Sequence, residues 1–141
     1  MRRERKIDNK GFSLVELIIV IAIMAILIGV MSPQLMKYVE RARQSKDTQA
    51  VDSVHTAVVT AMLDPAVDDA PATAHYTSLA QLYADTTCPN FVLAVQEIAN
   101  ESVAANIEGS SFVSKAYNGL TIDINIANSK VTCTVGSLVI D

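Results

Sequence analysis

A run of apolar residues near the start of the chain constrains the fold more than any other feature. From Phe12 to Met31 there are twenty residues, and only Ser13 and Glu16 among them are polar. A helix rises about 1.5 Å per residue, so this run would span about 30 Å, the thickness of the hydrocarbon layer of a membrane. The remaining sequence is too polar to supply a second run. We therefore expect one membrane-spanning helix.

The charged residues are segregated along the chain. The leader, residues 1–10, holds five basic and two acidic side chains, and a second basic segment contains Lys37, Arg41, Arg43 and Lys46 against Glu40. From residue 47 onwards there are eleven acidic residues and two lysines. Basic segments tend to stay in the cytoplasm, and the second segment has fewer basic residues than the leader and is partly offset by Glu40, so we expect the leader inside and the head outside. The acidic head argues against nucleic-acid binding.

The apolar run is longer than that of a secretory signal peptide, and no small-x-small cleavage site follows it, so we expect it to be retained.

The junction between the leader and the apolar run is unusual. It consists of Lys10-Gly11-Phe12-Ser13-Leu14-Val15-Glu16-Leu17. Glycine has no side chain and suits entry into a protease site. A carboxylate deep in a bilayer costs several kcal/mol, about 2.5–3.5 at the centre on insertion scales, so Glu16 needs an explanation. Either it is an acid tolerated at the interface, or it pairs with the amine that cleavage after Gly11 would create on Phe12 of a neighbouring subunit.

From Lys10 to about Pro33 the sequence resembles the type IV pilin family, which includes the pseudopilins of type II secretion and the competence pilins. The resemblance implies that a prepilin peptidase cuts between Gly11 and Phe12 and methylates the new amine of Phe12. It implies that Glu16 sets subunit registry by meeting the amine of an adjacent subunit. It also implies the type IV pilin fold, a helical homopolymer, and a separate assembly platform with an ATPase.

A weak point is expected in the apolar helix at Gly29 and Pro33. Proline lacks the N–H that would bond the carbonyl of Gly29, and glycine itself weakens a helix. One interpretation is a simple kink where the helix leaves the membrane. The other, suggested by the resemblance, is a hinge at Gly29–Pro33 that loses helicity when subunits pack into a filament.

The helix is predicted to continue to Leu63. Apolar residues recur at spacings of three and four along its second half: Ala50, Val51, Val54, Ala57, Val58, Ala61 and Met62. The opposite side is expected to be polar and to carry Asp47 and Asp52. Asp64-Pro65 ends it, since a residue before proline disfavours helix. The expected organisation is a cleaved leader at 1–11, a transmembrane and filament-core half-helix at 12–33, and an amphipathic half-helix with a globular head at 34–141.

The head is predicted to be α+β. The expected elements are a loop at 64–77, a helix at 78–84 with a capping box, a helix at 91–106 capped by Asn90, strands at 111–117 and 120–127 joined by an Asn118-Gly119 hairpin turn, and strands at 130–135 and 138–141. A turn at Asn128-Ser129 is expected to lead into the strand at 130–135. In the strand at 120–127, isoleucines alternate with polar residues, which predicts one buried face. We expect a three- or four-stranded antiparallel sheet packed on the second half of the long helix.

The remaining candidate sites are weak. Cys88 and Cys133 either form one disulfide, closing a loop of about 45 residues, or remain as two buried thiols. Asp64, Asp68 and Asp69 lack the pattern of a calcium loop, and a solvated acidic loop is favoured. His55 and His75 have no metal-ligand spacing. No metal, cofactor or catalytic set is predicted, and hence no enzyme.

These observations predict a structural subunit of a type IV pilus, held in the prokaryotic cytoplasmic membrane and then transferred into an extracellular filament for adhesion, twitching motility or related roles. Its expected partners are other copies of itself, the peptidase, the assembly machinery and, before assembly, membrane lipid. A pseudopilin of type II secretion or competence DNA uptake remains an alternative. A membrane-anchored adhesin that never polymerises is another.

Overall fold

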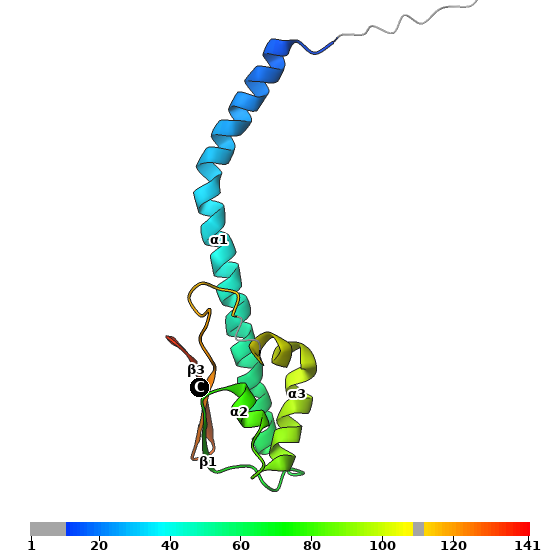
Figure 1. The fold of residues 1–141 in the computed structure, drawn as a ribbon, viewed down its shortest axis with the longest axis vertical. Coiled ribbons are helices and arrows are strands. Elements are labelled where there is room, and N and C mark those ends of the chain that lie inside the picture. The colour runs from blue at the N-terminus through cyan, green and yellow to red at the C-terminus, as the bar shows by residue number, and fades with distance from the viewer. Residues whose placement is uncertain (1–10, 109–111) are drawn as a thin grey trace, which may run out of the picture. The chain divides into compact units, whose positions relative to one another are not determined.

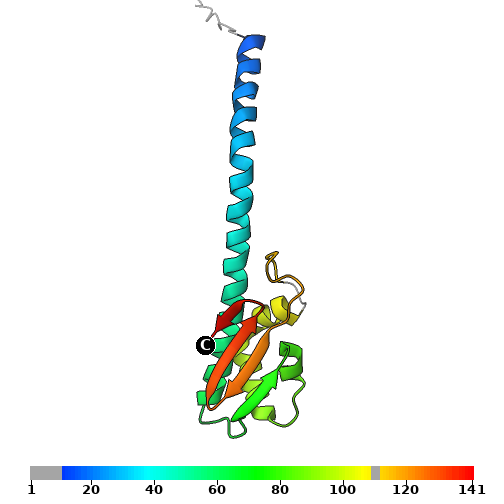
Figure 2. The same ribbon diagram turned by 90° about the vertical axis from the view of Figure 1, so that its left-hand side faces the viewer.

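The computed structural model describes residues 11–108 and 112–141 (Figures 1 and 2). The elements in chain order are α1 (Leu14–Leu63), β1 (Thr73–Tyr76), α2 (Leu79–Tyr83), α3 (Pro89–Glu108), β2 (Asp123–Ala127), β3 (Lys130–Val135) and β4 (Leu138–Ile140). The chain divides into two compact units, Met1–Tyr38 and Val39–Asp141, which are described separately below. We refer to the second unit as the head.

Helix α1 contributes to both units and confirms the long helix predicted from the sequence. It begins two residues after the expected start at Phe12 and ends at the expected Leu63. Beyond its end, the Asp64 carboxylate accepts a hydrogen bond from the amide of Ala66 at 2.8 Å, and the Asp64 carbonyl accepts one from Val67 at 3.0 Å. These bonds form a local turn, which leads the chain out of the helix at the Asp-Pro pair.

The second half of α1 presents the predicted apolar stripe to the core of the head. Its fully buried residues are Val51, Val54, Ala57, Val58 and Ala61, each with no exposed surface. Asp47 was expected on the opposite, polar side, and this is wrong. It lies one turn before Val51 in register with the stripe and is only 3% exposed. The apolar face of α1 therefore ends at a buried carboxylate.

The sheet has four antiparallel strands in the order β1-β2-β3-β4, as the α+β prediction required. Ile122, Ile124 and Ile126 are buried in and just before β2, and the intervening residues are not. The predicted turn at Asn128-Ser129 is confirmed. Both residues have positive φ angles, 52° and 63°, as the tight two-residue turn between Ala127 and Lys130 requires.

The hairpin predicted around Asn118-Gly119 is wrong. Of the expected strand at 111–117, residue 111 lies outside the described residues, and 112–117 form bends and a turn. The partner of β2 on this side is instead β1, in the segment predicted to be a loop, with Ala74 opposite Ile126 and Tyr76 opposite Ile124. The physical reason is that consecutive amides beginning at Val113 donate to carboxylates of α1, so they do not enter a strand ladder.

The two helices predicted in the head are both present, and the cap of one of them differs from the prediction. In α2, Ser78 caps the helix by accepting a hydrogen bond from the amide of Gln81 at 3.1 Å. Helix α3 begins at Pro89, so Asn90 lies inside its first turn and is not the cap that we expected. The carboxylate of Asp69 supplies that function, because it accepts from the amides of Asn90 and Phe91, both at 2.8 Å.

The core of the head lies between the sheet and the helices. Figures 1 and 2 show the sheet on one side, with α1 and α3 on the other. One cluster of buried side chains joins them: it includes Val54 and Val58 of α1, Phe91 of α3, and Ile124 and Cys133 of the sheet. Burying each large apolar side chain stabilises such a core by about 1.5–3 kcal/mol.

Candidate functional site

The predicted cleavage site precedes α1. Gly11, Phe12 and Ser13 are not helical, and Phe12 is 85% exposed. A Cβ added to Gly11 would meet no atom within 4 Å, so the fold itself does not require glycine there. The structure thus leaves the Gly11–Phe12 bond exposed at the start of the apolar segment.

Glu16 lies in the first turn of α1 and turns back toward the chain start. Its Oε2 accepts a hydrogen bond from the amide of Ser13 at 2.9 Å. A carboxylate three residues into a helix commonly caps a free amide at its start, and it also favours the positive end of the helix dipole. This local contact was not expected from the sequence. It places the Glu16 carboxylate one residue from the nitrogen of Phe12.

The apolar half of α1 is uncovered in the described part of the first unit. Every residue from Gly11 to Tyr38 is exposed, and the large apolar side chains are roughly half exposed or more. A surface of this size is far larger than the apolar patches that soluble monomers expose. By length and composition, α1 can cross a membrane. Gly29 and Pro33 lie inside α1, which is continuous through both. The hinge predicted there stays a prediction.

The neck of the head, residues 40–47 of α1, holds the loop after α3, a contact that the sequence did not predict. Asp47 accepts hydrogen bonds from the amides of Val113 at 3.0 Å and Ser114 at 2.8 Å. Glu40 accepts one from the amide of Lys115 at 2.6 Å. We call this set of three hydrogen bonds the latch. A carboxylate one helical turn before a buried stripe was the one sequence signal that could have indicated it.

The cysteines are both buried and both free thiols in the structure, which is the second of the two alternatives. Cys88 lies directly before α3, where the Tyr76 hydroxyl donates to Asp85 at 2.8 Å and the Cys88 thiol donates to the same carboxylate oxygen at 3.5 Å. Burial raises the pKa of the Cys88 thiol and of the Tyr76 hydroxyl. Burial also raises the pKa of Cys133, to about 12. Both thiols are therefore protonated at neutral pH, and a protonated thiol is a poor nucleophile.

The acidic loop after α1 has structural roles. Asp68 accepts from the side chain of Asn90 at 3.0 Å, and Asp69 caps α3 as described above. His55 donates from Nε2 to the carbonyl of Val131 at 3.2 Å, and His75 pairs with Asp123 at 2.9 Å. Among the residues that the structure describes, no group of three His, Cys, Asp or Glu side chains is placed to hold a metal ion.

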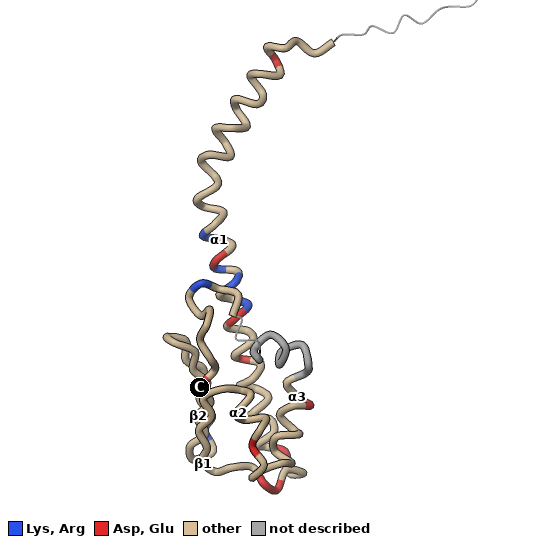
Figure 3. The backbone as a smooth tube through the Cα atoms, in the orientation of Figure 1, with Lys and Arg blue, Asp and Glu red and all other residues tan. Residues whose placement is uncertain are grey.

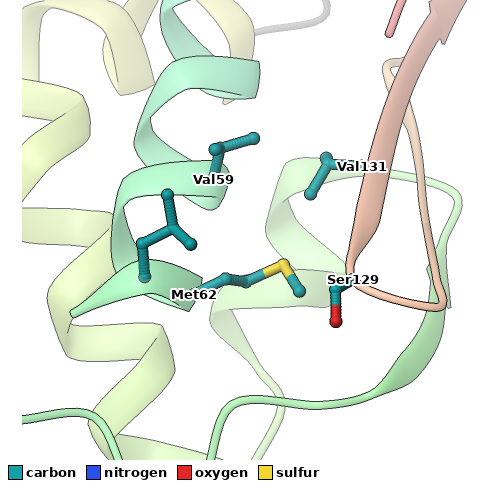
Figure 4. A pocket seen from close by; sticks show the side chains of 5 residues that line it. Val59, Met62, Ser129 and Val131 are labelled. Atoms are coloured by element: carbon teal, nitrogen blue, oxygen red, sulfur yellow. The ribbon is translucent and has the colours of Figure 1, made fainter. Parts of the chain in front are cut away.

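A small pocket of about 100 Å³ opens between the end of α1 and the β2–β3 turn (Figure 4). It is lined by Val59, Met62, Leu63, Ser129 and Val131. Figure 4 shows Met62 reaching across the gap toward Ser129. The lining offers one hydroxyl and no ionisable side chain, so it has no means of acid–base chemistry.

Comparison with known proteins decides what the N-terminal segment is. Residues 7–32 match the family described as the prokaryotic N-terminal methylation motif. The chain carries this motif. The match covers the predicted cleavage site, Glu16 and Gly29, and it ends one residue before Pro33. The methylation motif thus overlaps most of the uncovered part of α1, over residues 14–32.

Curated relatives match a longer part of the chain than the methylation motif does. The chain is 40% identical over 56 residues to the type IV major fimbrial protein FimA of Dichelobacter nodosus, covering 40% of this chain and 36% of that protein. A second FimA from the same organism matches at 40% identity over 56 residues, or 35% of its length. The chain therefore spans about a third of the length of these relatives. No solved structure matches the chain significantly.

Proposed function

We propose that this protein is a structural subunit of a type IV pilus. The single observation that carries the proposal is the methylation motif at residues 7–32, which coincides with a half-helix whose apolar side chains the chain leaves uncovered. Lipid tails or the helices of other copies can cover such a surface, and the two environments are similarly apolar. The same segment can therefore serve as a membrane anchor first and as the core of a filament afterwards.

Processing at Gly11 and Phe12 follows from this proposal. A prepilin peptidase would cut the bond between them and methylate the amine of Phe12, which makes residues 1–11 a leader and residues 12–33 the start of the mature helix. Support comes from the exposure of Phe12 and from the absence of any contact that requires glycine at position 11. The leader would remain on the cytoplasmic side of the membrane, and the head would lie outside.

Glu16 would set the registry between subunits. Its carboxylate is occupied by the Ser13 amide in the isolated chain, at the positive end of the helix. A cationic amine of Phe12 from a neighbouring copy would bind this carboxylate more strongly than a neutral amide does, most of all away from water. Exchanging the Ser13 amide for this amine would therefore stabilise subunits that pack in the correct register. The assembly platform and the ATPase that drive it would be separate proteins.

The relatives favour this role over the two alternatives. They are major fimbrial proteins, whereas nothing in the described residues points to secretion, DNA uptake or a non-polymerising adhesin. A filament subunit and an anchored protein that does not polymerise differ in the cell fraction from which the protein is recovered. Shearing cells should release a pilus subunit with the filament fraction, and an anchored protein would stay with the membranes.

Two glycine variants test the processing step within this experiment. Gly11→Val should leave the fold intact and block cleavage, so that the protein accumulates as a precursor and no filaments are sheared off. Gly29→Ala is the matched control, since a Cβ at Gly29 also meets nothing within 4 Å. It should be cleaved normally. Normal filaments from Gly11→Val would contradict the proposal.

A further inference from the structure

Two distant segments of the chain assemble a cluster of positive charge at the neck of the head. We call it the collar, and its members are Arg41, Arg43 and Lys46 of α1 and Lys115 of the loop after α3. All four side chains are exposed. Figure 3 shows most of the basic positions of the head gathered at the neck, with some acidic ones among them, and further acidic positions at the opposite end. The collar is therefore a local exception in an otherwise acidic head.

The latch holds Lys115 beside the basic residues of α1 through its backbone amide. Glu40 accepts from the backbone amide of Lys115, not from its side chain, so the ammonium group stays in solvent. Glu40 also lies 3.9 Å from the guanidinium of Arg43, which places the backbone of Lys115 beside this part of the collar. Asp47 is buried and directed at two amides of the loop. Both carboxylates of the neck are thus engaged by backbone groups.

The neighbouring residues are typical of a membrane–water interface. Tyr38 lies two residues before Glu40 in the same helix and is 65% exposed, and tyrosines are enriched at the level of lipid headgroups. In the latched loop, Val113 is 45% exposed beside Lys115. An apolar side chain next to cations suits a surface that offers both acyl chains and phosphates.

We propose that the collar binds the anionic headgroups of lipids on the outer side of the membrane before the subunit is assembled. The inference rests on the proposed function in one respect, namely that the apolar half of α1 lies in the bilayer. Chain connection then keeps Arg41 five residues from Met36, the last apolar residue before the basic segment, which is about 8 Å along a helix and within the range of unscreened attraction. The acidic surface of a second copy would be the competing partner, and it has no such connection.

Spin-labelled lipids test the proposal with the full chain in phosphatidylcholine vesicles. A trace of labelled phosphatidylglycerol, compared with labelled phosphatidylcholine, reports the preference of the protein for the anionic headgroup. Lys115→Glu should lower this preference, by up to about fivefold for each charge lost. Lys130→Glu is the matched control, because it makes the same charge change on β3, where Lys130 pairs with Asp141 at 2.9 Å. It should behave as the wild type.

Asp47→Ala separates the latch from net charge. It makes the chain more positive by one unit, so charge alone predicts a stronger preference for phosphatidylglycerol. Release of the loop, and of Lys115 with it, predicts a weaker one. Equal preferences in the Lys115→Glu and Lys130→Glu variants would overturn the proposal. So would a Lys115→Glu variant that loses filaments but keeps the wild-type lipid preference, which would assign the collar to a second copy. Because the vesicles hold unpolymerised protein, failure here leaves the pilus proposal intact.

Discussion

The substitution Asp47→Ala offers a quantitative test of how the latch holds the loop after α3 to α1. The Asp47 carboxylate is 3% exposed and accepts two backbone hydrogen bonds, at 3.0 Å from Val113 and 2.8 Å from Ser114. Hydrogen bonds to charged groups contribute about 1.5–3 kcal/mol each, so their combined loss would cost about 3–6 kcal/mol.

Two effects reduce this cost. Alanine is a better helix former than aspartate by roughly 0.5 kcal/mol, and the variant no longer buries a charge. We therefore expect the free energy of unfolding of the head to fall by about 2–4 kcal/mol. With the urea dependence of a small domain, the midpoint should move down by about 1–2 M.

The assay is urea unfolding of the full chain in a mild detergent, followed by the circular dichroism of the tyrosines. Hydrogen exchange of the amides of Val113 and Ser114 identifies the segment that opens. Asp52→Ala is the matched control, because Asp52 is an exposed acid on the same helix, and it should leave the midpoint nearly unchanged. Equal midpoints for the Asp47→Ala and Asp52→Ala variants would refute the latch as a source of stability.

Three further predictions concern the two thiols, the loss of stability at low pH and the hinge in α1. Alkylation of the denatured chain without reductant should label Cys88 and Cys133 fully, and protection of both would show a disulfide. Hydrogen bonds from Thr87 lower the pKa of Asp85 from 3.8 to about 2, so its contribution to stability is present above pH 4 and lost as the pH falls from about 4 to about 2. Asp85→Asn should therefore flatten acid unfolding in that window, and an unchanged profile would contradict the assignment. Pro33→Ala should restore a helix hydrogen bond and give filaments that extend less under force; equal extensibility would exclude the hinge.

Local patterns in the sequence were enough to predict most elements of the fold. The spacing of Val51, Val54 and Val58 predicts which face of α1 is buried, and the alternation ending at Ile126 predicts β2. These signals are local, because burial on one face of a helix or strand imposes its own period. The turn at Asn128-Ser129 could be predicted for the same reason.

The predictions that proved wrong concern segments whose backbone amides bind a group that is distant in the sequence. Asn118-Gly119 does form a turn, but the amides before it, from Val113 to Lys115, donate to carboxylates more than sixty residues earlier in the chain. Asn90 was a plausible cap, and Asp69 took its place from 21 residues away. Such contacts have no sequence period. They depend on which segments the fold brings together, and sequence patterns alone do not reveal this.

The candidate site likewise has one part that local sequence shows and one part that depends on contacts between distant segments. The junction at Gly11, Phe12 and Glu16 could be singled out because the role proposed for it depends on adjacent residues, and the match at residues 7–32 covers it. The collar could not be predicted as a unit, since Lys115 joins Arg41 and Arg43 only through the latch. Three of its four residues were visible in the sequence as a basic segment after the apolar run.

The most direct test of the proposed function is the N-terminal mass of this protein in sheared filaments. The account predicts a chain that starts at Phe12, carries one added methyl group on its amine and is recovered with the filaments. A chain that retains Met1 in cells with an active prepilin peptidase would contradict the proposed processing. A processed chain found in membranes alone would contradict its role as a filament subunit.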